Sequence, residues 1–175
     1  MGIERSKRPI AAARIATVAR RLLDSSTLCA IATVAPNGRA HVNTAYFAWS
    51  RRFNLVWLSE PRAAHSRNIE AGGSAAIAVY DSGQTWGRPD RGIQLFGTAQ
   101  EVAPAAAREA RELYAARFPA YDESELSAYR FYVFRPQRIK LFDEREFGTG
   151  VFVTARLARV DQLVWERTEI YRSRT

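Results

Sequence analysis

In the first third of the chain, the spacing of hydrophobic residues is first typical of an α-helix and then typical of β-strands. Over residues 10–24 the apolar side chains are spaced as on one face of an amphipathic helix, which leaves the arginines toward solvent. Apolar runs at 28–34, 40–49 and 53–59 predict three strands. The first two runs are separated by Pro36-Asn37-Gly38, and Asn-Gly favours a tight hairpin because both residues tolerate a positive φ.

The remainder of the chain continues with short apolar runs separated by polar loops. Elements are predicted here as a short helix at 59–72, strands at 75–80 and 93–102, a helix at 105–117, and a last strand at 129–134 and 138–142. The short helix has Ser59 as its N-cap, Glu60 and Pro61 in its first turn, and Gly72 as its stop. The last strand is interrupted near Pro136, and no clear pattern follows Gly148.

Hairpin connections predict a largely antiparallel sheet. About six strands with small flanking helices indicate an α+β fold, and closure into a split β-barrel would remove the exposed sheet edges. Since no repeat or linker interrupts the chain, we expect one domain over 1–175, with a core at 1–147 and a C-terminal extension at 148–175.

Composition narrows the class of protein. With 47% hydrophobic and 25% charged residues in 175, the chain has the make-up of a soluble globular protein. A single cysteine, Cys29, cannot form an internal disulfide, and two histidines, His41 and His65, argue against a metal centre. No apolar run is long enough to span a membrane and no signal peptide is evident, so we expect a cytoplasmic protein.

A net charge of +8 allows an anionic partner. The arginines are scattered and not gathered in a stripe with aromatic residues, which argues against nucleic-acid binding. The densest polar cluster lies at the strand-to-helix junction, residues 59–67. There Arg62, His65 and Ser66 have the spacing of one helical face, and a helix start favours a phosphate. The alternative is a solvated helix whose arginines lie along its surface.

The strand at 40–49 adds a second feature. His41 and Asn43 share one face with Phe47 and Trp49, and a groove that mixes amide and aromatic groups suits a flat heteroaromatic ring. The alternative is an ordinary strand with satisfied side chains.

The loop around Trp86 is interpreted as a lid or as a plain exposed hairpin.

Four segments, in their order and spacing, carry a resemblance to a known family: 33–42, 56–59, 65–69 and 93–99. Over its first four-fifths the chain resembles the pyridoxamine 5′-phosphate oxidase-like flavin-binding split barrels. The resemblance implies a homodimer with two FMN sites at the subunit interface. It implies phosphate contacts at the end of the third strand and the start of the short helix.

Carried over by position, the resemblance implies twelve cofactor-binding residues. They are Asn43, Thr44, Ala45, Tyr46, Leu58, Ser59, Arg62, His65, Ser66, Arg67, Trp86 and Gln94. The chain departs from the family oxidases in three places. Gly92 stands where they carry a glutamine, Asn43 replaces an arginine, and their substrate-reading Arg/Asp segment is not found after Asp143.

The resemblance implies a flavin-dependent oxidoreductase that uses FMN as cofactor and acts on a small-molecule substrate of unknown identity. Two alternatives stay open: a reductase that uses the deazaflavin F420, and a non-catalytic flavin or haem carrier on the same barrel. No side chain is assigned as catalytic. His41 is a conceivable acid or base, although a residue at the barrel rim would have the same pattern.

Overall fold

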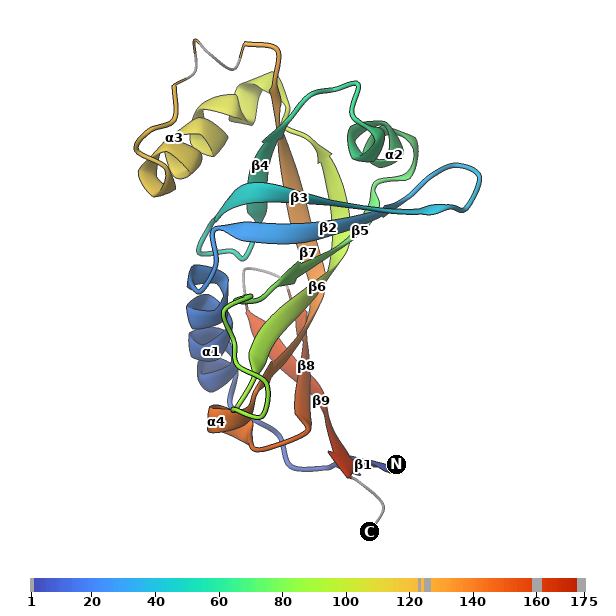
Figure 1. The fold of residues 1–175 in the computed structure, drawn as a ribbon, viewed down its shortest axis with the longest axis vertical. Coiled ribbons are helices and arrows are strands. Elements are labelled where there is room, and N and C mark those ends of the chain that lie inside the picture. The colour runs from blue at the N-terminus through green and yellow to red at the C-terminus, as the bar shows by residue number, and fades with distance from the viewer. Residues whose placement is uncertain (1, 123, 125–126, 159–161, 173–175) are drawn as a thin grey trace. The chain divides into compact units, whose positions relative to one another are not determined.

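In the computed structural model, six strands close into an antiparallel barrel (Figure 1). The structure describes residues 2–172 apart from 123, 125–126 and 159–161. The barrel strands are β2 (Leu28–Val34), β3 (Ala40–Trp49), β4 (Leu55–Ser59), β5 (Ser74–Val79), β6 (Arg91–Glu101) and β7 (Arg130–Asp143). Their order is β7-β4-β3-β2-β5-β6, and a further pairing between β6 and β7 closes the ring. The predicted α+β split barrel is therefore confirmed.

By its internal contacts the chain divides into two compact units. The central unit comprises Thr27–Ile77 and Phe96–Pro136, and the terminal unit comprises Met1–Ser26, Ala78–Leu95 and Gln137–Thr175. Strands β5, β6 and β7 each contribute residues to both units.

The central unit is built around aromatic residues of β3, β4 and β7. Register pairs Phe47 with Trp57 and Trp57 with Tyr132, and all three side chains are buried. The rings of Trp57 and Tyr132 stack with centroids 5.8 Å apart. The 3-10 turn η1 (Pro104–Ala106) leads into helix α3 (Ala107–Arg117), whose Ala110 and Tyr114 join a second cluster over the sheet.

The terminal unit combines helix α1 (Ala12–Asp24), β1 (Gly2–Ser6) and the hairpin of β8 (Val151–Leu157) and β9 (Leu163–Arg172). Strand β9 pairs with both β8 and β1, and α1 contacts β9. The apolar face of α1, which includes Ile15 and Leu22, is buried. The short helix α4 (Glu144–Phe147) follows β7 directly. No helix in the described part of the chain has the length and apolar character needed to cross a bilayer.

One sequence prediction fails at Pro136, because β7 continues through it as a single strand of 14 residues. Residues 130–134 pair with β4, whereas residues 138–141 pair with β8. Proline has no backbone N–H to donate, and Pro136 lies where neither of these two ladders requires one. The expected interruption is therefore a change of partner and not a break.

The short helix also differs from its prediction. Helix α2 (Ala64–Gly72) begins five residues after Ser59, which is paired with Arg130 as the last residue of β4. Residues 60–63 form a turn in which the Ala63 N–H donates to the Glu60 carbonyl oxygen at 3.0 Å. Ser59 is thus not an N-cap. The left-handed glycine after the helix is Gly73, at φ 66°, one residue beyond the predicted stop.

Candidate cofactor-binding site

An open groove of about 490 Å³ lies in the central unit where β3 and β4 meet the turn before α2. This volume is within the usual range of small-molecule sites. Seven of the twelve predicted cofactor residues line the groove, namely Asn43, Thr44, Ala45, Tyr46, Leu58, Ser59 and His65. The structure thereby brings together two segments of the prediction, the strand at 43–46 and the junction at 58–65.

Ser59 is the centre of a small polar cluster at one end of this groove. Its Oγ lies 2.7 Å from Nε2 of His65 and 3.1 Å from Oγ of Ser66, and all three residues are buried. The Ser66 hydroxyl donates to the Glu60 carbonyl oxygen at 2.9 Å. The turn at 60–63 folds the start of α2 back onto the end of β4, which is why residues six and seven positions apart meet.

Burial lowers the pKa of His65 below its ordinary value of 6.5, and the neighbouring His41 lowers it further. The two imidazole rings lie nearly parallel, at 9°, with centroids 6.3 Å apart. Two positive charges at that separation would repel each other, and the surroundings of His65 are partly desolvated. The neutral form of His65 is therefore favoured, and its Nε2 shares a hydrogen bond with Ser59 Oγ.

The three basic and polar residues predicted to share a helical face are distributed differently. Arg62 lies in the turn before α2 and is exposed, whereas His65 and Ser66 lie in the first turn of the helix and are buried. Arg67, the other arginine predicted to contact the phosphate, is exposed on the helix. The Arg67 guanidinium donates to the Arg62 carbonyl oxygen. The expectation of one face shared by Arg62, His65 and Ser66 is thus wrong, because the helix starts after Arg62.

Asn43 provides an unsatisfied polar atom on the wall of the groove. Its Nδ2 donates weakly to the Thr44 carbonyl oxygen at 3.4 Å, whereas its Oδ1 is fully buried and has no hydrogen-bond partner among the described residues. Buried acceptors without a partner are uncommon in folded proteins and call for an explanation. A donor supplied by a bound molecule is one such explanation.

Four further residues of the groove were not predicted from the sequence: Glu60, Ala63, Tyr114 and Tyr129. Tyr114 reaches the groove from α3, and burial raises the pKa of its hydroxyl to about 12. It packs against Phe118 and Tyr121 with ring centroids 4.7 and 5.5 Å away. The amphipathic pattern of α3 could have shown that Tyr114 is buried, but not that β3 and β4 are its neighbours.

The last two predicted residues belong to the terminal unit. Trp86 is fully exposed in the loop before β6. That loop is held by Gln84, whose side chain donates to the Arg91 carbonyl oxygen at 3.0 Å and accepts from the Arg91 N–H at 2.7 Å. Gln94 lines a different groove, which it shares with Phe142, Phe152 and Tyr171.

Cys29 is a core residue, as expected from its apolar strand. It is 3% exposed in β2, and burial raises the pKa of its thiol to about 12. A thiol that stays protonated is a poor nucleophile.

Three comparisons with known proteins bear on this geometry. The family model described as pyridoxamine 5′-phosphate oxidase matches residues 15–143. No curated protein matches the sequence significantly.

Among solved structures, the protein Atu2129 of unknown function from Agrobacterium tumefaciens has a TM-score of 0.67 at 19% identity. The alignment covers 86% of this chain but 60% of that protein, so the chain spans less than two thirds of its length.

Two further structures carry names that state a ligand. A haem-binding protein from Mycobacterium smegmatis has a TM-score of 0.59 at 14% identity, over 94% of this chain and 89% of that one. An FAD-binding protein from Mesorhizobium loti has a TM-score of 0.58 at 16% identity, over 79% and 95%. At these identities the likeness concerns the fold. The family match spans all six barrel strands and by itself shows that the chain belongs to the pyridoxamine 5′-phosphate oxidase-like family.

Proposed function

We propose that this chain binds FMN in the groove between β3 and β4 and acts as a flavin-dependent oxidoreductase. The observation that supports this most directly is that seven residues predicted to contact the cofactor line one groove of suitable volume. A second support is the FAD-binding protein with the same fold.

The phosphate of FMN would lie at the Ser59 end. If His65 carries its proton on Nε2, it donates to Ser59 Oγ at 2.7 Å. The Ser59 hydroxyl lies 3.3 Å from the Glu60 carbonyl oxygen and 3.1 Å from Ser66 Oγ, and it would turn from these acceptors to donate to the phosphate. Arg62 and Arg67, exposed in the adjoining turn and helix, supply positive charge beside this end. The phosphate would thus meet one hydroxyl donor and two exposed guanidinium groups.

The ring of the flavin would lie along β3. Its N–H edge would meet the amide of Asn43, whose Oδ1 lacks a donor and would have to turn toward the groove to accept one. Tyr46 is exposed and lines the groove, and Tyr114 closes the side formed by α3. When bound, the flavin supplies the hydride or electron transfer, while these residues bind it, orient it and limit the access of water.

We also propose that the chain is a homodimer. On the outer face of the β2–β3 hairpin, Leu28 pairs in register with Tyr46, and Ala32 with Val42. Leu28, Val42 and Tyr46 are 43, 63 and 57% exposed. A contiguous apolar sheet face of this kind is typical of an interface, and a second copy would cover it.

Two alternatives remain for the ligand. F420 has a related tricycle and a phosphate, so the same groove would suit it. A haem carrier would need an imidazole nitrogen free to bind iron, whereas Ser59 engages Nε2 of His65. This hydrogen bond argues against His65 as an iron ligand, whereas His41, whose ring lies parallel to that of His65, would be the imidazole to consider for haem.

The first test is the absorbance spectrum and mass of the small molecule that co-purifies with the protein. Oxidised flavin bands would support the proposal, whereas a Soret band would replace it with the haem alternative. Stopped-flow reduction by NADPH, or by reduced F420, then distinguishes an enzyme from a carrier.

The second test locates the phosphate. FMN and riboflavin differ only in this group, so the double variant Arg62→Ala/His65→Ala should weaken FMN binding far more than riboflavin binding. Removing a hydrogen bond to a charged group costs about 1.5–3 kcal/mol. Arg51→Ala, an exposed arginine that does not line the groove, is the matched control. Equal weakening for both ligands would show that the phosphate lies elsewhere.

A further inference from the structure

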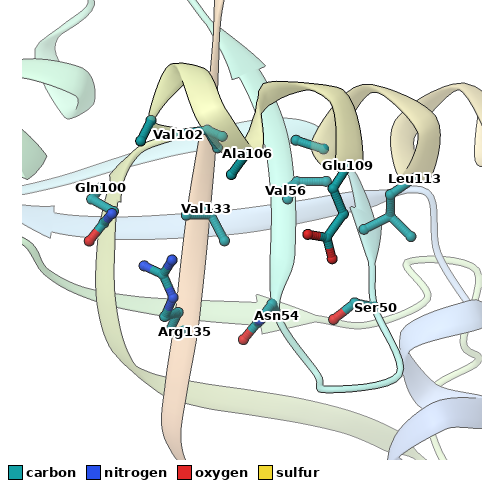
Figure 2. A pocket seen from close by; sticks show the side chains of 12 residues that line it. Ser50, Asn54, Val56, Gln100, Val102, Ala106, Glu109, Leu113, Val133 and Arg135 are labelled. Carbon is teal, nitrogen blue, oxygen red and sulfur yellow. The ribbon is translucent and has the colours of Figure 1, made fainter.

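A second cavity, of about 130 Å³, lies in the central unit between α3 and the strands beneath it (Figure 2). It shares no lining residue with the candidate cofactor groove. Its apolar lining includes Val56, Val102, Ala106, Ala110, Leu113 and Val133. Val56, Ala110 and Val133 also belong to the buried cluster under α3, so the cavity opens from the edge of a packed core.

Polar side chains surround this apolar floor. Figure 2 shows Gln100 on β6, Arg135 on β7, Asn54 before β4, and Glu109 descending from α3 toward the strands. Among the described residues, none forms a hydrogen bond or ion pair with these four side chains. Gln100, Glu109 and Arg135 are exposed, so the mouth of the cavity presents a carboxylate, a guanidinium and two amides that only water satisfies in the free protein.

The charges restrict the ligand. A simple carboxylate would pair with Arg135 but would be repelled by the negative charge of Glu109. A simple amine would pair with Glu109 but would be repelled by the positive charge of Arg135. A zwitterion satisfies both, with its carboxylate toward Arg135 and its ammonium group toward Glu109. The apolar floor adds a preference for an aliphatic side chain.

The volume limits the size of that side chain. A dry cavity of about 150 Å³ can hold a molecule as large as benzene, so 130 Å³ accommodates a branched aliphatic group of a few carbon atoms. We propose that this cavity binds a small aliphatic α-amino acid.

The position of Glu109 has an explanation that does not involve a ligand. Glu109 lies in the first turn of α3, where a negative charge is favourable without any ligand. Arg135 is exposed on β7, so in the free protein solvent accounts for its charge as well. The test must therefore address Arg135 and Glu109 separately.

Isothermal titration calorimetry on the full chain provides this test, with L-valine and L-leucine as probes. Two analogues of leucine keep its skeleton and lack one charge: 4-methylpentanoate has no ammonium group, and 3-methylbutylamine has no carboxylate. We expect both analogues to bind at least about tenfold more weakly than leucine. Equal binding of leucine and either analogue would overturn the proposal.

Charge-removing variants then assign each interaction. Arg135→Gln should weaken the binding of leucine at least about tenfold and leave the binding of 3-methylbutylamine unchanged. Glu109→Gln should also weaken the binding of leucine at least about tenfold, but it should leave the binding of 4-methylpentanoate unchanged. Glu112→Gln, exposed on the same helix and outside the cavity, is the matched control. No heat of binding for valine or leucine at concentrations on the order of 10 mM would also overturn the proposal.

Discussion

Gly97 of β6 lies directly against the backbone carbonyl of Arg135 in β7. A β-carbon added to Gly97 would stand 2.1 Å from that oxygen and 2.9 Å from Cα of Pro136. Both neighbours are backbone atoms, so no change of rotamer could make room. The close approach occurs where β6 and β7 complete the barrel, and it explains why a residue without a side chain is required there.

Gly97→Ala should lower the free energy of unfolding by about 2–3 kcal/mol, because the strands must separate to admit one methyl group. Equilibrium unfolding in urea measures this. Gly72→Ala is the control, since a β-carbon there would meet nothing within 4 Å. If both variants were equally stable, the close approach of Gly97 to Arg135 would be absent in solution.

Asn43→Leu should separate stability from cofactor binding. Replacing a buried acceptor that has no partner with an apolar group of similar size should leave the free energy of unfolding unchanged or raise it by about 1 kcal/mol. Binding of FMN should weaken at the same time. Thermal unfolding and a fluorescence titration with FMN measure the two effects. A marked loss of stability would show that Oδ1 has a partner within the chain.

His65 should make stability depend on pH. Its pKa is lower in the folded protein than the ordinary 6.5 of the unfolded chain, so the unfolded state binds a proton more readily. This contribution to the free energy of unfolding is fully present above pH 6.5 and declines as the pH falls below that value. His65→Gln should flatten the decline. An NMR titration in which His65 ionises at or above pH 6.5 would contradict the prediction.

Asp143 should be a critical residue of the terminal unit. Its buried carboxylate accepts the N–H groups of Arg145 and Glu146 at the start of α4 and pairs with Arg21 at 2.8 Å. Asp143→Ala removes a helix cap and leaves Arg21 with the more exposed Glu146, which should cost about 2 kcal/mol in urea unfolding. Glu146→Gln should cost less than about 1 kcal/mol, because that pair is solvated.

Val42→Arg should convert the proposed dimer to a monomer. The substitution places a charge in the middle of the exposed apolar face of the β2–β3 hairpin. Light scattering coupled to size-exclusion chromatography measures the mass. Ile3→Arg, at a similarly exposed position of β1, should leave the mass unchanged. A wild-type monomer, or a variant that stays dimeric, would remove this face as the interface.

Local sequence patterns predict most of the barrel. The bounds of β2 and β3 agree with the predicted ones, and Gly38 has the positive φ, 80°, expected in the hairpin between them. The apolar alternation and the Asn-Gly turn are both local features, so sequence alone determines them. The strands β8 and β9 were missed, although the β-branched and aromatic run at 151–154 carried a signal for the first of them.

The site was predicted less completely, since its arrangement depends on contacts between distant segments. Sequence reasoning selected Ser59 and His65 but treated them as parts of one helix, whereas a turn brings them together across the end of β4. Tyr114 could not be predicted, because its position depends on where α3 packs. The cofactor, the dimer and the cytoplasmic location remain predictions.

The change of partner along β7 has a consequence for truncation. Residues 138–141 form their ladder with β8, which lies beyond the segment that matches the family model. A protein that stopped at Phe147 would leave Ile139 and Leu141, both buried now, on an unprotected sheet margin. Such a margin is prone to pair with other chains, so the shortened protein should self-associate into insoluble material even though every barrel strand is still present.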